Sequence, residues 1–195
     1  DIVMLHFFPQ QLQSIVRNFK GVIVFQAFGL LQESSYTDMI LADLGIAALE
    51  KIKSLGQRFF FAQAYPHLKN VECKFFQQRS IDLPIGLPRK KGKRWVGGDE
   101  RFLFVLPRIN TSKYFQLIYA DFKKNFSGMD YIIAGAQPIT VQNDDNVAGF
   151  MSNEEYTYIM NQASAMYYHS TEKNHIHYHP FEAIQNGMPV IFMAG

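Results

Sequence analysis

The chain has 195 residues, of which 48% are apolar and 15% aromatic, so it can bury a sizeable core and is not a disordered polar segment. A formal net charge of +2 gives no global electrostatic basis for binding nucleic acid. The single cysteine, Cys73, excludes an internal disulfide framework and fits a reducing compartment. No apolar run approaches the roughly 18 residues that cross a bilayer, and Asp1 does not open a signal-peptide pattern, so we expect a cytoplasmic protein.

Short apolar runs in the first half are typical of strands buried on both faces of a parallel sheet. They are residues 2–5, 22–25 and 59–62. Between the second and third runs, residues 35–55 have the pattern of one long helix, which Ser34 or Ser35 can cap and Gly56 can end. The apolar face of this expected helix is Ile40, Leu44, Ala47 and Ala48.

Residues 83–98 are rich in proline, glycine and basic residues, which is typical of a connection between two lobes. We place the boundary near Trp95, which gives one domain of residues 1–94 and a second of residues 95–195. The basic cluster is Arg89, Lys90, Lys91, Lys93 and Arg94. It is either a solvated linker or a patch for an anionic membrane or a phosphate, so a peripheral contact with the inner membrane face stays open.

Strands and helices are predicted to alternate in the second half, which indicates α/β architecture with a parallel sheet. The expected strands are residues 101–106, 131–134, 165–168 and 188–193. The first expected helix has an apolar stripe and stops at Gly128; the stripe is Phe115, Ile118, Phe122 and Phe126. Ser152 and Glu155 form a capping box for the next helix, and Pro180 and Gly187 mark the start and the end of the last.

Ligands of such sheets bind beyond the carboxyl ends of the strands, so the turns there are where chemistry is expected. The turn 107–112 carries Arg108, and Lys113 follows at the start of a helix. Two cations at a helix N-terminus can hold a diphosphate, since backbone amides and the helix dipole add to their charge. The alternative is that both are ordinary surface cations.

Residues 179–191, HPFEAIQNGMPVI, resemble the donor-site signature of glycosyltransferases of the two-lobed GT-B type, in which a Glu-Ala pair opens a helix that ends in Gly-x-Pro-Val. Arg108 and Lys113 fall where the retaining members of this fold carry an Arg and a Lys after the first strand of the second lobe. The resemblance covers residues 101–195 well and residues 1–94 more loosely. It implies two Rossmann-like lobes, and we expect the chain to contain only part of each.

The resemblance implies that Glu182 holds the nucleotide ribose and that Arg108 and Lys113 neutralise the diphosphate leaving group. A carboxylate accepts hydroxyl donors well, and cations stabilise charge that grows on the phosphate. The simpler alternative for Glu182 is a carboxylate that satisfies the helix dipole.

Two positions depart from the family pattern. Asn174 stands where retaining members have a second Glu that touches the donor sugar, and Asn can still bond sugar hydroxyls without charge. Phe28 stands where many relatives place a His near the reacting sugar.

Three histidines alternate just before the last predicted helix, at His175, His177 and His179. In an extended segment they face one way and could converge on a zinc ion. As loop residues they would instead line the donor cleft. His6, at the end of the first strand, is a candidate on the acceptor side or a satisfied strand-end histidine.

The leading hypothesis is an enzyme that transfers a sugar from a nucleoside diphosphate sugar to a hydroxyl of a glycan or a lipid-linked acceptor, with no cofactor and no assigned metal ligand. Its predicted catalytic residues are Asn174 and His6. Its predicted donor-binding residues are Arg108, Lys113, His175, His179, Phe181 and Glu182. The alternatives are a non-catalytic nucleotide-binding partner subunit and a metal-dependent hydrolase that uses the histidines.

Overall fold

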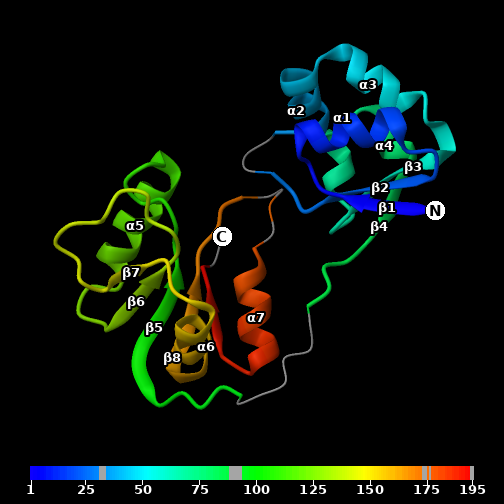
Figure 1. Ribbon diagram of the computed structural model, residues 1–195. Coiled ribbons are helices and arrows are strands. Elements are labelled where there is room, and N and C mark those ends of the chain that lie inside the picture. The colour runs from blue at the N-terminus through cyan, green and yellow to red at the C-terminus, as the bar shows by residue number, and fades with distance from the viewer. Residues whose placement is uncertain (31–33, 88–93, 173–174, 176, 194–195) are drawn as a thin grey trace. The chain divides into compact units, whose positions relative to one another are not determined.

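The computed structural model describes residues 1–30, 34–87, 94–172, 175 and 177–193 (Figure 1). It is an α/β structure with two sheets of parallel strands. The first unit comprises Asp1–Gly86 and Glu172–Ile176, and the second comprises Leu87–Thr171 and His177–Gly195. The predicted linker residues 89–93 lie outside the described residues.

The first unit holds a four-stranded parallel sheet whose strands follow in chain order, β1-β2-β3-β4. Its strands are β1 (Ile2–Leu5), β2 (Val22–Ala27), β3 (Phe59–Gln63) and β4 (Ser80–Asp82). Its helices are α1 (Pro9–Asn18), α2 (Tyr36–Leu44), α3 (Ile46–Lys53) and α4 (Lys74–Gln78), with 3-10 turns η1 (Gly56–Arg58) and η2 (Leu68–Val71). The predictions of strands at 2–5, 22–25 and 59–62 are confirmed.

Helices cover one face of this sheet (Figure 1). Each strand is added on the same side of the previous one, and right-handed crossovers of that kind all fall on one face. The covered face carries a stack of aromatic rings, in which Phe25 and Phe61 have centroids 6.1 Å apart and Phe59 and Phe76 5.3 Å apart. On the opposite face, Ile2 is 73% exposed.

The prediction of one helix over 35–55 is wrong, because Gly45 breaks it into α2 and α3. Gly45 has φ 77°, a left-handed conformation that no helix interior contains and that glycine adopts easily. The N-terminus is as expected, since the Ser35 side chain accepts a hydrogen bond from the Asp38 N–H. The break turns the second half of the segment, so Ala47 is exposed although the pattern placed it on the apolar face.

A buried carboxylate, that of Glu72, binds the N-terminus of helix α2 in the first unit. Glu72 accepts hydrogen bonds from the backbone N–H groups of Tyr36 (2.8 Å) and Thr37 (2.9 Å) and from the Thr37 hydroxyl (2.6 Å). It therefore caps the first turn of α2 from a distant part of the chain. Burial raises the pKa of Glu72 although these bonds oppose the change.

The second unit holds a five-stranded parallel sheet in the order β7-β6-β5-β8-β9. Its strands are β5 (Asp99–Val105), β6 (Tyr131–Ala134), β7 (Val147–Gly149), β8 (Ala163–Tyr168) and β9 (Val190–Phe192). Its helices are α5 (Lys113–Asn125), α6 (Asn153–Gln162) and α7 (Tyr178–Asn186). The four predicted strands are present, with ends shifted by a few residues except for β6, and β7 was not predicted.

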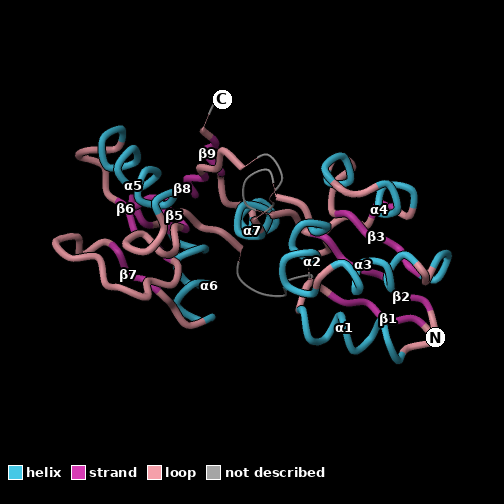
Figure 2. Tube along the Cα trace, turned by 90° about the horizontal axis from the view of Figure 1, so that it is seen from above, coloured by secondary structure: helices cyan, strands magenta, loops and turns pink. Residues whose placement is uncertain are grey.

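Helices pack on both faces of this sheet, with α5 on one side and α6 on the other (Figure 2). Alternate residues of β5 show the two cores, since Phe104 packs with the aromatic stripe of α5 and Leu103 packs with α6 and α7. The Ser152–Glu155 capping box is confirmed at the start of α6. Gly187 ends α7 in the left-handed conformation as predicted, whereas Pro180 is the third residue of α7 and not the first.

Asp144 fastens the loop before β7 to helix α5. Its carboxylate accepts hydrogen bonds from the hydroxyls of Tyr119 (2.5 Å) and Tyr131 (2.8 Å) and from the Lys123 ammonium (3.0 Å), which also bonds Tyr131. Burial alone would raise the pKa of Asp144, but these partners outweigh it and lower that pKa.

Among the described residues, no helix combines the length and the apolar composition that crossing a bilayer requires.

Candidate functional site at the carboxyl edge of the second sheet

The direction in which the chain adds strands to the second sheet reverses between β5 and β8. From β5 the chain adds β6 and then β7 on one side, and it returns to place β8 and then β9 on the other. The loops that leave β5 and β8 therefore diverge, and in open parallel sheets such a switch point is where ligands bind.

The loop after β5 holds Arg108 in an uncommon backbone conformation. Its φ is 54°, a left-handed value that costs a residue with a Cβ about 1 kcal/mol or more. The conformation is fixed on both sides, because the Arg108 N–H donates to the Ala136 carbonyl (2.9 Å) and its own carbonyl accepts from the Ser112 N–H (3.0 Å). The guanidinium lies 5.3 Å from the centroid of the Phe115 ring. Arg108 is thus an exposed cation on a rigid turn.

Gln137 ties the turns after β5 and β6 together. Its amide nitrogen donates to the carbonyls of Leu106 (2.7 Å) and Gly135 (3.2 Å), and its amide oxygen accepts from the Ile109 N–H (2.9 Å). Gly135 has φ 115°, and a Cβ there would lie 3.0 Å from the Pro107 nitrogen. Only glycine fits this close approach of the two turns.

A contact across the switch point joins α5 to the exit of β8. The Tyr114 hydroxyl accepts from the Thr171 N–H at 3.2 Å. Lys113, one residue earlier, is exposed at the first position of α5. The cation and the exit loop of β8 therefore flank the same edge of the sheet.

His169 leaves β8 on the side of α5 and is 5% exposed. Its Nδ1 lies 3.3 Å from the Tyr167 hydroxyl and 4.0 Å from the Asp121 carboxylate. Burial lowers the pKa of His169, and the charge of Asp121 opposes this only in part. No local sequence pattern singles out His169, Tyr114 or Gln137, because their contacts join segments that are far apart in the chain.

A pocket of about 200 Å³ opens at the carboxyl ends of β5 and β6. Its walls come from both strand ends and from the start of α6: Val105, Ala134, Gly135, Phe150, Met151, Asn153 and Tyr156. Glu182 on α7 is half-buried. It lies near the pocket-lining Tyr156, whose pKa is raised first by burial and then by the negative charge of Glu182. The predicted ribose ligand thus neighbours a pocket at the expected edge.

The three alternating histidines are divided between the two units. His175 forms a β-bridge with Gly29 in the first unit. In the second unit His177 precedes α7 and its Nδ1 lies 2.9 Å from the Tyr168 hydroxyl, while the ring of His179 packs 5.4 Å from that of Tyr168. In the part of the chain that the structure describes, no group of three His, Cys, Asp or Glu residues could hold a metal ion. Nothing there supports the metal-dependent hydrolase.

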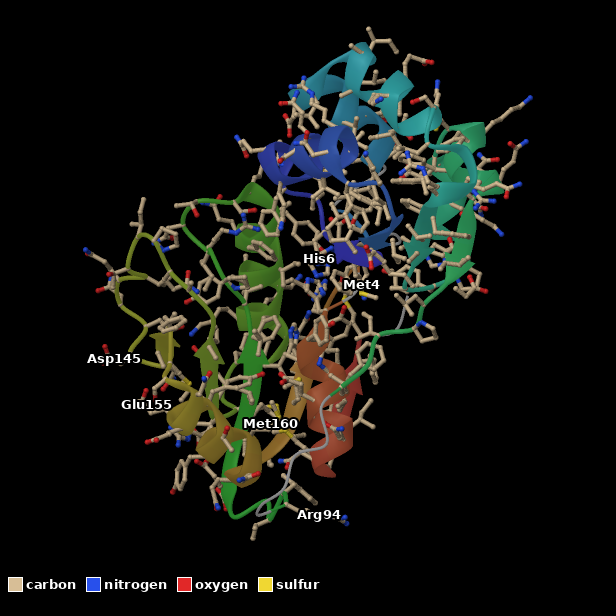
Figure 3. The ribbon with its side chains drawn as sticks, turned by 45° about the vertical axis from the view of Figure 1, so that its right-hand side comes forward. Met4, His6, Arg94, Asp145, Glu155 and Met160 are labelled. Carbon is tan, nitrogen blue, oxygen red and sulfur yellow. The ribbon has the colours of Figure 1, made fainter. Side chains whose placement is uncertain are left out.

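The remaining predicted residues fall in three places. Phe181 is 41% exposed on α7. Asn174 lies outside the described residues. His6 is exposed just beyond β1, where Figure 3 labels it with Met4, and its ring centroid is 4.7 Å from that of Phe28. The two candidates on the first sheet, His6 and Phe28, therefore touch.

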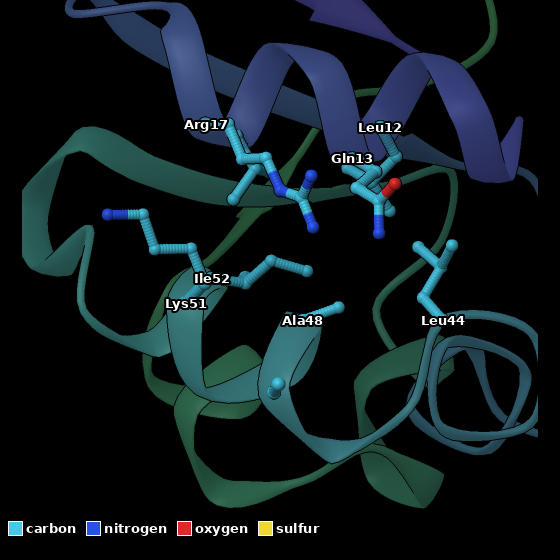
Figure 4. Close-up of a pocket in the computed structure, with 9 residues that line it drawn as sticks. Leu12, Gln13, Arg17, Leu44, Ala48, Lys51 and Ile52 are labelled. Carbon is cyan, nitrogen blue, oxygen red and sulfur yellow. The ribbon is translucent and has the colours of Figure 1, made fainter.

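A small cavity lies in the first unit between α1 and the α2–α3 pair (Figure 4). Leu12, Gln13 and Arg17 line it on α1, and Ala48 and Lys51 line it on α3. Its volume of about 90 Å³ is far below the several hundred Å³ of a typical ligand pocket. We interpret it as a packing gap between helices.

Neither known family models nor characterised proteins match this chain. The class that the fold defines is an α/β protein with two sheets of parallel strands, which hosts many activities. The function has to be argued from the site.

Proposed function

We propose that the protein is a glycosyltransferase that binds a nucleoside diphosphate sugar at the carboxyl edge of the second sheet and transfers the sugar to a hydroxyl of a glycan or a lipid-linked acceptor. The observation that carries the proposal is the reversal of strand order between β5 and β8, with Arg108 and Lys113 directly after β5. The pocket at the ends of β5 and β6, with Glu182 nearby, gives the nucleotide a place at the same edge.

The charges suit departure of a diphosphate. As the bond between sugar and phosphate breaks, negative charge grows on the leaving phosphate, and a preorganised cation lowers the barrier. The backbone of Arg108 is held by its hydrogen bonds with Ala136 and Ser112, so this cation stands on a fixed turn. Lys113 adds a second charge beside the amides of the first turn of α5.

Glu182 is assigned to the ribose. It is the predicted donor-binding residue whose neighbour, Tyr156, lines the pocket. A carboxylate accepts hydrogen bonds from two adjacent hydroxyls, which only the sugar part of a nucleotide offers. His179 and Phe181, on the first turns of α7, are the other donor-binding residues that this proposal takes from the second unit.

Under this proposal the first unit belongs to the acceptor lobe of a two-lobed GT-B enzyme, and His6 acts near the reacting sugar. The basic residues 89–94 would allow a peripheral contact with an anionic membrane from the cytoplasmic side.

The test is calorimetry of the full chain with UDP and GDP. Arg108→Ala, Lys113→Ala and Glu182→Ala should each weaken the binding of the preferred nucleotide about tenfold, because each removes a charged partner. Lys124→Ala in the last turn of α5 and Glu100→Ala in β5 are matched controls that should bind as the wild type does. A folded chain that binds neither nucleotide, or site variants that bind like the controls, would overturn the proposal.

A second candidate is a non-catalytic relative that binds nucleotide as a partner subunit. Its support is Phe28, whose apolar ring packs against His6 where relatives have an imidazole near the sugar. It predicts nucleotide binding without transfer. Turnover of a sugar nucleotide that Glu182→Ala abolishes would exclude it.

A further inference from the structure

A groove of about 490 Å³ runs along the flank of α6 in the second unit. Figure 3 labels Glu155 near the start of this helix and Met160 near its end. The groove is lined by residues of β6, the β7–α6 connection and α6 itself: Ile132, Ala148, Phe150, Met151, Glu154, Glu155, Tyr158 and Ile159. Its size is in the range of pockets that hold small molecules.

The walls of the groove suit a flat ring. Phe150 is 83% exposed and Tyr158 is 63% exposed, although both are large aromatic side chains. Ile132 and Ile159 are buried and add apolar surface to the lining of the groove. Exposed aromatic faces in an apolar lining favour stacking of a base, which by itself is tolerant of the base's identity.

Apart from the Tyr158 hydroxyl, the polar side-chain groups in the groove are carboxylates, which only accept hydrogen bonds when ionised. Glu155 is already used, since it accepts from the Ser152 N–H at 2.8 Å in the capping box. In the described residues, no hydrogen bond or ion pair engages the carboxylate of Glu154. The groove therefore offers one acceptor pair to a ligand with N–H donors and repels phosphate.

The groove continues into the pocket at the carboxyl ends of β5 and β6. Phe150 and Met151 line both. The pocket leads to Tyr156, which neighbours Glu182. A ring stacked in the groove could therefore belong to the same molecule as a ribose at Glu182.

We infer that the groove binds guanine and that the donor is a guanosine diphosphate sugar, an inference that rests on the proposed function. Guanine presents a ring N–H and an adjacent amino group on one edge, and together they match the two oxygens of the Glu154 carboxylate. Uracil has one N–H between two carbonyls that a carboxylate repels. Adenine has no ring N–H on that edge.

The test is calorimetry of the full chain with GDP, with inosine diphosphate, which lacks only the 2-amino group, and with UDP. GDP should bind about tenfold more tightly than inosine diphosphate and UDP, the discrimination expected of one bidentate pair. Glu154→Gln should reduce this preference to less than about threefold and leave UDP affinity unchanged, which also shows that the variant is folded. Glu100→Gln in β5 is the matched control and should keep the full preference.

Two outcomes would overturn the inference. One is UDP or inosine diphosphate binding as tightly as GDP, and the other is a GDP preference that Glu154→Gln does not change. If Arg108→Ala still weakens every nucleotide in those cases, the base assignment fails and the proposed function stands. If a folded chain binds none of the three, both fail.

Discussion

The two sheets contain only parallel strands, yet they differ in the order in which the chain adds them. The first sheet grows in one direction from β1 to β4, and its cavity of about 90 Å³ lies between helices. The second sheet reverses between β5 and β8, and its pockets of about 200 and 490 Å³ lie at the carboxyl edge and along α6. Parallel strands alone do not make a site, and the reversal of strand order marks the edge at which open sheets of this kind bind ligands.

The units also differ in how each uses a buried acid. Glu72 caps a helix with two backbone donors and one hydroxyl, and its pKa is raised. Asp144 has a lysine among its partners, and its pKa is lowered. At Asp144 the hydrogen bonds from Tyr119 and Tyr131, followed by the bond and charge of Lys123, outweigh the desolvation of the carboxylate, whereas at Glu72 desolvation outweighs the three donors.

The largest expected effect is on the first unit. Glu72→Ala leaves the N–H groups of Tyr36 and Thr37 and the Thr37 hydroxyl without their acceptor in a buried place, so we expect a loss of about 2–4 kcal/mol of unfolding free energy. Urea denaturation followed by circular dichroism measures it. Glu50→Ala, on the exposed side of α3, should change little. Equal effects of the two variants would refute the capping role.

The next effect tests the close approach behind the candidate site. Gly135→Ala places a Cβ 3.0 Å from the Pro107 nitrogen at φ 115°, so it should cost about 2–3 kcal/mol and weaken nucleotide binding by displacing Arg108. Gly128→Ala, at φ 84° with nothing within 4 Å, should cost only about 1 kcal/mol and leave binding intact. Urea denaturation and calorimetry of the Gly135→Ala and Gly128→Ala variants separate the cost of the backbone conformation from the cost of the close contact with Pro107. If Gly135→Ala behaves like Gly128→Ala, the two turns are not held as described.

The contributions of Glu72 and Asp144 to the unfolding free energy should change with pH in opposite directions. The raised pKa of Glu72 means that its contribution is present below 4.5, its ordinary value, and is lost as the pH rises through the folded pKa. The lowered pKa of Asp144 means that its contribution is present above 3.8 and is lost as the pH falls through the folded pKa.

The measurement is urea unfolding from pH 3 to pH 7, followed by circular dichroism for the first unit and by the fluorescence of Trp95, the chain's single tryptophan, for the second unit. The stability advantage of wild type over Glu72→Gln should shrink as the pH rises above 4.5. The advantage over Asp144→Asn should shrink below about pH 4. Parallel curves for wild type and either variant would contradict the corresponding assignment.

The smallest effect concerns the cavity of the first unit. Ala48→Leu adds carbon atoms from α3 into the gap, so it should raise the unfolding free energy by about 0.5–1 kcal/mol. Ala42→Leu on the exposed surface of α2 is the control and should be nearly neutral. A loss of stability in Ala48→Leu alone would mean that the gap is too small or has another use.

The sequence predicted those parts of the fold that local patterns determine. The run 131–134 is a strand because four buried residues fill both faces, and the Ser152–Glu155 box forms because its two bonds join residues three apart. The helix expected over 35–55 failed because apolar spacing continues through Gly45, and only the backbone shows the turn there. Strand β7 was missed because three residues are too few to carry a period.

The candidate site was predictable only in part, for the same reason. Arg108, Lys113 and Glu182 could be named because they follow a strand or open a helix in a familiar pattern. The left-handed turn at Arg108, the Gln137 bonds and the Tyr114–Thr171 contact join segments about 30 to 60 residues apart, and no local signal marks such pairs. The histidine pattern left two interpretations open, because spacing alone does not show that His175 bridges to Gly29 in the first unit whereas His177 and His179 pack near Tyr168 in the second.

Hydrogen exchange with and without saturating GDP measures whether the switch point of the second sheet binds a nucleoside diphosphate. We expect slower exchange in peptides covering residues 106–115, 135–137 and 150–158, and unchanged exchange in residues 12–17 and 44–52 around the small cavity. Protection confined to those last two segments, or no protection anywhere, would contradict it.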